Sequence, residues 1–164
     1  MPTVTSFPPG TGAAEARLAA LGYAVPAAAT PAANYVPYVQ TGDLVWIAGQ
    51  VPVRGGVFRW IGRVGVDFSL EEGQEAAREA MLNVLGQLKA ALGGDLDRVV
   101  QVVKLNGFVA SPADFTQHPH VMNAASELAV AAFGEAGRHA RAAVGVSSLP
   151  FGVAVEIDGV FRVR

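Results

Sequence analysis

The chain has 164 residues, of which 51% are hydrophobic and 16% charged, and its formal net charge is −2. This length fits a single domain, and the slightly acidic balance excludes the strongly basic surface that tight nucleic-acid binding requires. The chain contains no cysteine, which excludes disulfide bonds, a thiol nucleophile and a cysteine-ligated zinc site.

The apolar content is high for a soluble monomer, with a mean hydropathy of +0.34. No apolar run approaches the roughly 20 residues of a membrane-spanning helix, so no membrane association is expected. The excess apolar surface therefore indicates a subunit interface. The first residues lack the charged and apolar regions of a secretory signal, which favours a cytoplasmic location.

The N-terminal part, residues 1–33, is expected to form an arm with a short helix, ahead of an α+β domain over residues 34–164. Residues 1–11 are rich in Pro, Gly and Thr and predict a loose arm. Residues 15–21 predict the short helix. The Ala- and Pro-rich residues 24–33 are typical of a linker that lies over the surface.

Three short strands are predicted next. Residues 35–40 are interrupted by Pro37, which cannot donate a backbone hydrogen bond and therefore favours an edge strand. Residues 44–51 are almost entirely apolar and predict a buried strand. Residues 57–61 follow a Gly-Gly turn and predict a third strand.

The clearest local signal is a long helix that begins after Ser69. Ser69 and Glu72 have the spacing of a capping box, in which each side chain bonds a free backbone N–H of the other residue. Apolar residues then recur at helical spacing, at Ala77, Met81, Val84, Leu88 and Ala91. Gly93-Gly94 ends the helix, and residues 99–110 predict a central strand that is covered on both faces.

A second helix and two strands complete the chain. Ser111-Pro112 restarts a helical stretch, Pro119 interrupts it, and the main helix is expected over residues 120–133. Residues 140–147 and 153–163 predict two strands that a tight turn joins as a hairpin. The order of elements implies an α+β domain with a mixed β-sheet and two long helices packed on one sheet face.

Arg141 and Glu156, one on each strand of that hairpin, are the candidate catalytic residues. An arginine binds a carboxylate through two parallel hydrogen bonds, and a glutamate can pass protons to and from water. The expected register puts Glu156 opposite Gly145, on the same face as Arg141 but roughly 13 Å from it. A substrate between them needs long side chains or contributions from two subunits. The alternative is that both residues are solvated surface residues.

No metal ion and no cofactor are expected. His118, His120 and His139 lack the i, i+4 spacing of a metal-binding pair on a helix. Tyr38 and Asn123 are further candidate site residues. For these two the alternatives are packing on an edge strand and an exposed position on a helix.

Four segments of the chain resemble the RidA/YjgF family, whose members are also labelled endoribonuclease L-PSP. They are Val36-Pro37-Tyr38-Val39-Gln40, Ile47-Ala48-Gly49-Gln50-Val51-Pro52, Ala140-Arg141-Ala142-Ala143-Val144-Gly145-Val146 with Leu149-Pro150, and Val155-Glu156-Ile157-Asp158. The last two carry the most specific part of the pattern. The resemblance covers most of the chain, from about residue 35 to the C-terminus.

This resemblance implies a chorismate-mutase-like α+β subunit and a homotrimeric barrel with substrate clefts between subunits. It also implies the hydrolysis of reactive enamines and imines, of the 2-aminoacrylate and 2-iminopropanoate type, to 2-oxo acids and ammonia. The implied partner is therefore a small-molecule imine or 2-oxo acid.

The same resemblance implies roles for individual residues. Arg141 would bind the substrate carboxylate, and Glu156 would orient or activate the attacking water. Tyr38 would line the cleft from a neighbouring subunit. The other contacts would be the backbone at Gly49 and Ala143 and, in support, Asn123.

Two other functions stay open. An endoribonuclease or translation inhibitor is an activity reported for the family, but the chain has no basic stripe to neutralise phosphates. A non-catalytic binder of small carboxylates would use the same Arg141. Ala48 and Ala143 stand where the family often has a hydroxyl residue and a cysteine, and these departures leave the exact substrate open.

Overall fold

The structure of the protein is a computed structural model that describes residues 12–31 and 33–164. The loose arm expected over residues 1–11 lies outside the described residues. The helices and strands, with η for short 3-10 helices, are α1 (Ala13–Ala20), β1 (Tyr38–Thr41), β2 (Leu44–Gln50), β3 (Val53–Arg54), β4 (Val57–Phe58), α2 (Leu70–Ala91), η1 (Leu96–Arg98), β5 (Val99–Ala110), α3 (His118–Phe133), η2 (Gly134–Gly137), β6 (Ala140–Val146), η3 (Pro150–Gly152) and β7 (Val155–Val163).

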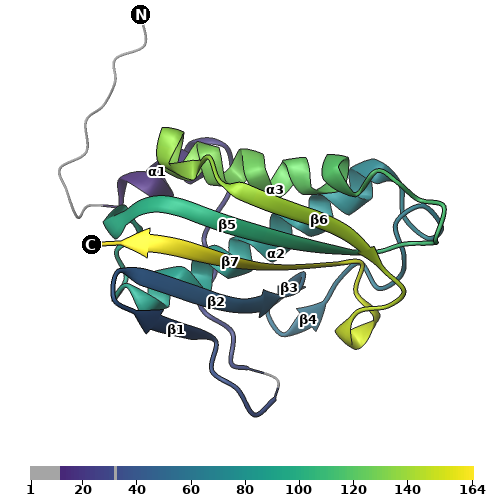
Figure 1. Ribbon diagram of the computed structural model, residues 1–164, viewed down its shortest axis with the longest axis horizontal. Helices are drawn as coiled ribbons and strands as arrows, with labels where there is room; N and C mark the ends of the chain where they lie inside the picture. The colour runs from purple at the N-terminus through teal and green to yellow at the C-terminus, as the bar shows by residue number, and fades with distance from the viewer. Residues whose placement is uncertain (1–11, 32) are drawn as a thin grey trace, which may run out of the picture.

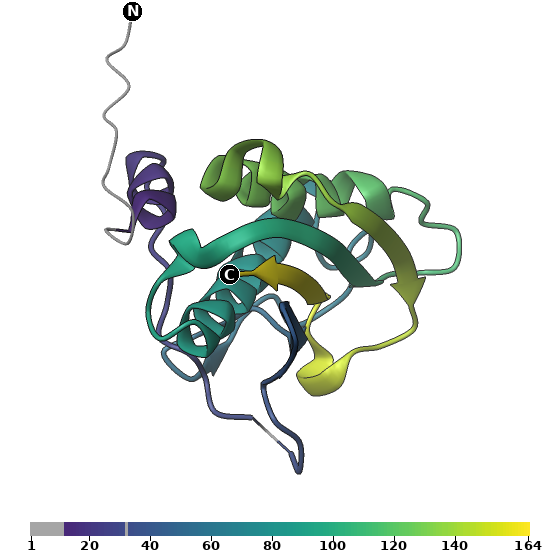
Figure 2. The same ribbon diagram turned by 60° about the vertical axis from the view of Figure 1, so that its left-hand side comes forward.

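A five-stranded mixed sheet forms the centre of the fold, in the order β1-β2-β7-β5-β6 (Figure 1). β5 and β6 run parallel, and the other neighbours are antiparallel. α2 and α3 pack on the same face of the sheet and against each other (Figure 2). The expected α+β architecture, with two long helices on one sheet face, is confirmed.

The predicted hairpin between the last two strands is wrong, because β5 lies between β6 and β7. β7 pairs with β5 from Val99↔Val163 to Val109↔Val155, and with β2 on its other side. The connection over residues 147–154 contains η3 instead of a tight turn, so it is long enough to carry the chain past the end of β5. β7 thereby becomes the middle strand of the sheet.

The face of the sheet under the helices holds the hydrophobic core. The predicted capping box of α2 is present, and the predicted apolar stripe from Ala77 to Leu88 is buried. Val155, Ile157 and Phe161 of β7 reach this core, as their alternation with polar residues predicts.

The opposite face of the sheet stays open in the single chain. It carries exposed apolar side chains, with Val39 53%, Trp46 51% and Val144 46% exposed. The prediction that the 99–110 strand is covered on both faces is therefore wrong for one chain, because the helices cover a single face. Such a band of apolar residues is unusual on the surface of a monomer.

Helix α1, near the N-terminus, packs against the body of the protein. Ala14 and Leu18 of α1 are fully buried. The carboxylate of Asp97 accepts hydrogen bonds from the backbone N–H groups of Ala13 and Ala14, at 2.8 and 2.9 Å. This cap from a distant residue lets α1 begin two residues before the predicted residues 15–21.

Two further predictions differ from the structure. Residues 57–61 do not form a third strand of the main sheet, because β4 pairs only with β3 in a separate two-stranded sheet. Pro119 does not interrupt the second helix. It lies in the first turn of α3, where proline is tolerated because its missing N–H has no partner within the helix.

Replacing Ser69 with alanine is expected to lower the free energy of unfolding by about 1 kcal/mol, because an N-cap is lost. The Ser69 hydroxyl accepts from the Glu72 N–H at 3.1 Å, and the Glu72 carboxylate accepts from the Ser69 N–H at 2.8 Å. Urea unfolding followed by circular dichroism measures the change. Ser148→Ala, at an exposed loop position, is the control and should cost less than about 0.5 kcal/mol.

Candidate functional site

Arg141 lies at the start of β6, on the face of the edge strand that α3 covers. Its Nη1 donates hydrogen bonds to Asn123 Oδ1 and Ser126 Oγ, both at 3.0 Å, and its Nη2 donates to the Pro119 carbonyl at 3.3 Å. The structure thus brings Arg141 and Asn123 together. Ala143, two residues further along β6, faces the same way and packs against the core.

A chain of hydrogen bonds extends from Arg141 to His139. His139 Nδ1 lies 2.6 Å from the Gly137 carbonyl, which can only accept, so Nδ1 carries the proton. In the neutral ring, Nε2 then accepts from the Ser126 hydroxyl at 3.0 Å. Burial is the main cause that lowers the pKa of His139 from its ordinary 6.5; the bond to Gly137 opposes this, and the charge of Arg141 adds to it.

Glu156 lies on β7 with its side chain on the open face of the sheet, between the buried Val155 and Ile157. The side chain is half-buried, and this burial raises the pKa of Glu156 above its ordinary 4.5. The charge of Asp158, which accepts a hydrogen bond from Asn106 at 2.7 Å, raises it as well.

Gly49 of β2 is a close-approach position beside Glu156. A Cβ atom at residue 49 would overlap Glu156 Oε1, so the glycine leaves the space that the carboxylate occupies. The structure therefore brings Gly49 and Glu156 together, as it does Arg141 and Asn123.

These two pairs do not meet within one chain. Arg141 of β6 pairs with Leu105 of β5, which in turn pairs with Gly159 of β7. Glu156 of β7 pairs with Phe108 of β5. From strand geometry, the Cα atoms of Arg141 and Glu156 are separated by about 10 Å across the sheet and about 10 Å along it. Their side chains also lie on opposite faces. The expected position of both on one face is wrong, because Glu156 is level with Val144 through Phe108 and not with Gly145.

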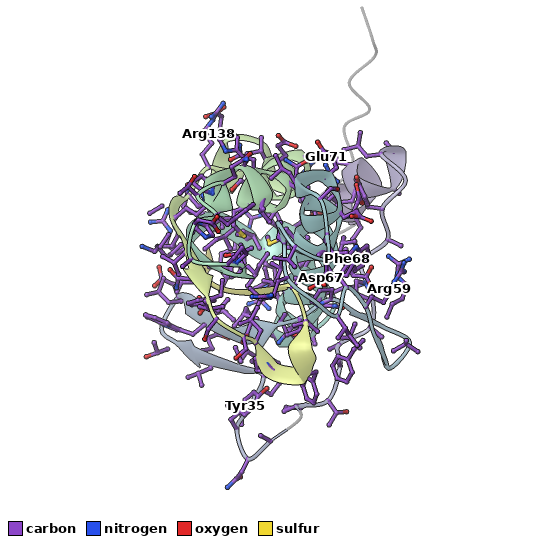
Figure 3. The ribbon with its side chains drawn as sticks, turned by 90° about the vertical axis from the view of Figure 1, so that its right-hand side faces the viewer. Tyr35, Arg59, Asp67, Phe68, Glu71 and Arg138 are labelled. Carbon is purple, nitrogen blue, oxygen red and sulfur yellow. The ribbon has the colours of Figure 1, made fainter. Side chains whose placement is uncertain are left out.

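Tyr38 lies on β1, the other edge strand, so the full width of the sheet separates it from Arg141. It pairs with Ile47 of β2 and packs partly against the core. Figure 3 shows the neighbouring Tyr35 on the loop that leads into β1, below the turn that contains η3.

A partly open cavity of about 460 Å³ lies beside Glu156. Its walls come from the end of β2, the β3–β4 hairpin, η3 and residues 28–31. Among the described residues that line it, Glu156 is the only carboxylate, and there is no lysine or arginine. None of these described lining residues is a cation that would offset the burial of Glu156.

Two aromatic residues at this cavity were missed by the sequence analysis. Phe58 and Phe151 stack with their ring centroids 4.1 Å apart. Phe151 is 52% exposed and has a left-handed backbone conformation, with φ +60°. For a residue with a side chain this conformation costs about 1 kcal/mol. A phenylalanine directly before Gly152, in a turn, was the available signal.

Comparison with known proteins identifies the family. Residues 15–156 match the family described as "YjgF/chorismate_mutase-like, putative endoribonuclease". The chain is 50% identical over 155 residues to "Protein TCP17" of Trypanosoma cruzi, covering 94% of this chain and 96% of that protein. The chain therefore belongs to the YjgF family, and its resemblance to RidA/YjgF proteins is confirmed.

Solved structures share this fold. A protein of unknown function from Agrobacterium tumefaciens is similar with 45% identity, a TM-score of 0.88 and 93% of each chain covered. A "putative endoribonuclease" from Shewanella oneidensis has 33% identity and a TM-score of 0.88, over 92% of this chain and 99% of that one. RidA from an Antarctic Psychrobacter has 30% identity and a TM-score of 0.57, over 83% and 94%.

Two further findings concern membrane-spanning helices and metal sites. Among residues 12–31 and 33–164, no helix combines the length and apolar character that crossing a membrane requires. In the same described ranges, no three His, Asp or Glu side chains gather as they would around a metal ion.

The lowered pKa of His139 predicts a pH dependence of stability. In the unfolded chain His139 takes up a proton near pH 6.5, whereas in the folded protein it does so only at a lower pH. The contribution of the neutral ring is therefore complete above pH 6.5 and is lost as the pH falls through the lower folded pKa. When the pH falls from 7 to 5, the free energy of unfolding should decrease less in His139→Gln than in wild type. Urea unfolding at the two pH values measures this decrease. Equal losses would contradict the assignment, and His120→Gln, at an exposed position, is the control.

Proposed function

We propose that the protein hydrolyses the reactive imines and enamines of small amino acids, of the 2-aminoacrylate and 2-iminopropanoate type, to 2-oxo acids and ammonia. The observation that carries the proposal is the way in which α3 holds the Arg141 side chain. α3 holds its guanidinium by three hydrogen bonds while the group stays at the edge of the sheet. Glu156, with a raised pKa, supplies the group for proton transfer.

Arg141 is suited to bind the substrate carboxylate. A guanidinium has five N–H groups, and the bonds to Asn123, Ser126 and Pro119 use three of them. Within the described residues, Nε–H and one Nη2–H remain as donors for the two oxygens of a carboxylate.

Glu156 is suited to act as the general base. It takes a proton from a water molecule as the water oxygen bonds to the imine carbon, C2. The imine reacts with its nitrogen protonated, so the attack leaves a neutral amino group at C2. Glu156 then passes its proton to that nitrogen. As the C2–N bond breaks, the C2 hydroxyl gives its proton to Glu156 and becomes the carbonyl, and ammonia and the 2-oxo acid leave. An enamine first takes up a proton at C3 to give the same imine. A carboxyl with a raised pKa exchanges protons more readily near neutral pH than an ordinary glutamate.

The site requires a homotrimer in this proposal, because Arg141 and Glu156 are apart in one chain. Arg141 lies at the β6 edge and Tyr38 at the β1 edge, so a head-to-tail ring brings these two edges together between neighbours. Arg141 of one copy would then face Tyr38, Gly49 and Glu156 of the next. The exposed apolar side chains of the open sheet face provide a surface for this association.

A mixture of two inactive variants tests the shared site. Arg141→Ala and Glu156→Gln should each lose at least about 100-fold in activity, because one removes the carboxylate anchor and the other the base. Co-expressed in equal amounts, they should recover about a quarter of wild-type activity, since random assembly unites the two intact residues at about one interface in four. Ammonia release from imines made by an amino acid oxidase measures the activity.

The control for the mixture is Arg138→Ala, which removes an exposed arginine that pairs with Glu135 and points outward (Figure 3). This variant should keep wild-type activity. Two inactive variants that stay inactive when mixed would contradict a site shared between subunits. An active Arg141→Ala variant would contradict the role of Arg141 itself. Binding of 2-oxo acids without any turnover would instead indicate a carboxylate-binding protein.

The pH profile tests the role of Glu156. The base must be ionised, and burial raises its pKa above 4.5. kcat/KM should therefore fall as the pH decreases, with an apparent pKa above 4.5 on the acid side. Asp158→Asn removes the negative charge that contributes to the raised pKa, so it should move this apparent pKa downward. An acid limb that stays in place in Asp158→Asn would contradict the assignment to Glu156.

A further inference from the structure

The cavity beside Glu156 is much larger than the smallest substrates of the proposed reaction need. Its volume is about 460 Å³, whereas an apolar cavity of about 150 Å³ is enough to hold a benzene molecule. The methyl group of 2-iminopropanoate would leave most of this space to water. The volume therefore fits a larger group attached to the reacting carbon.

The walls of the cavity are mainly apolar. Val51, Val53, Pro37 and Pro150 line it together with the stacked rings of Phe58 and Phe151. Since Glu156 supplies the only charge among the described lining residues, an anionic side chain finds no cationic partner here. Apolar walls of this kind favour an aliphatic or aromatic group.

Phe151 is held at the cavity against its own backbone preference. A phenylalanine with φ +60° is strained, and glycine would adopt this conformation without cost. The ring is also half-exposed, so burial in the core does not explain its position. Strained residues that persist are concentrated at ligand-binding sites. Phe151 stacks on Phe58, and both rings line the cavity that Glu156 also lines.

Another wall of the cavity, formed by residues 28–31, is fixed by Gln87 of α2. This side chain is 2% exposed, and its Nε2 donates a hydrogen bond to the Ala29 carbonyl at 2.6 Å. Residues 28–31 are thereby tied to the long helix and form one side of the cavity. A wall held in this way keeps its shape whether or not a ligand is present.

We propose that this cavity receives the side chain of the substrate and selects imines that carry a bulky apolar or aromatic side chain. This inference rests on the proposed function, since Glu156 acts at C2 and the side chain is attached to that same carbon. A group held against Glu156 at C2 therefore has its side chain within reach of Phe58 and Phe151. The imines derived from leucine and phenylalanine would be better substrates than the imine derived from alanine.

Competition between hydrolysis and trapping by semicarbazide tests the preference. The imines are generated by an L-amino acid oxidase from alanine, leucine and phenylalanine. For the wild-type protein, kcat/KM for the phenylalanine-derived imine should exceed that for the alanine-derived imine by about 10- to 100-fold. Phe151→Gly should reduce this ratio to about threefold or less while relieving the backbone strain. Phe58→Ala should reduce the ratio in the same direction.

Leu21→Ala is the matched control, because it removes a large exposed apolar side chain that does not line this cavity. It should keep the wild-type ratio. Melting temperatures of the variants show that they remain folded. Equal kcat/KM values for the three imines in the wild-type protein, or a ratio that persists in both Phe58→Ala and Phe151→Gly, would overturn the inference.

Binding of the stable 2-oxo acids separates the inference from the proposed reaction. Phenylpyruvate should bind wild type at least about tenfold more tightly than pyruvate in calorimetry, and Phe151→Gly should remove most of this difference. If no imine is hydrolysed but this binding pattern is found, the proposed function fails and the ligand class stands. If imines are hydrolysed but pyruvate binds as tightly as phenylpyruvate, the inference fails and the proposed function stands.

Discussion

The pairing of β7 with β2 on one side and β5 on the other is the constraint on which the rest of the structure depends. It makes β7 the middle strand, so that Val155, Ile157 and Phe161 enter the core beneath the helices. Because successive side chains of a strand point to opposite faces, Glu156 must then lie on the open face. The same pairing leaves β6 at the edge, with Arg141 under α3.

The two ionic groups consequently have different environments. Arg141 has oxygen acceptors on α3 and a neutral imidazole, His139, at the end of the same hydrogen-bond chain. Glu156 is half-buried beside another carboxylate, without a cation among the described residues of its cavity. This imbalance accounts for the raised pKa of Glu156. In the proposed trimer, an arginine from the next subunit and the substrate carboxylate would complete the site together.

The cavity is assembled from segments that are far apart in the sequence. Residues 28–31 come from the N-terminal segment, Phe58 from β4, Gln87 from α2 and Phe151 from η3. The Asp97 carboxylate holds the first residues of α1, and Gln87 holds residues 28–31 through the Ala29 carbonyl. The N-terminal segment thus contributes to the shape of the candidate site, beyond its contribution to the core.

The amino-acid sequence by itself determined part of the local structure and indicated the family. The capping box at Ser69, the strand over residues 99–110 and the alternation of β7 follow from side-chain patterns between near neighbours. The resemblance to RidA/YjgF proteins correctly indicated the family and the fold, whereas the roles of the candidate residues stay predictions. The pairs Arg141–Asn123 and Gly49–Glu156 then proved to be in contact.

Only the tertiary structure decided which strands are neighbours. A period-two pattern states which side chains share a face within one strand, but not which strand lies beside it. The connection over residues 147–154 could form a hairpin or pass the end of β5, and long-range pairing selected the second. The separation of Arg141 from Glu156 follows from that choice, and the stacking of Phe151 on Phe58 likewise joins residues that are distant in the chain.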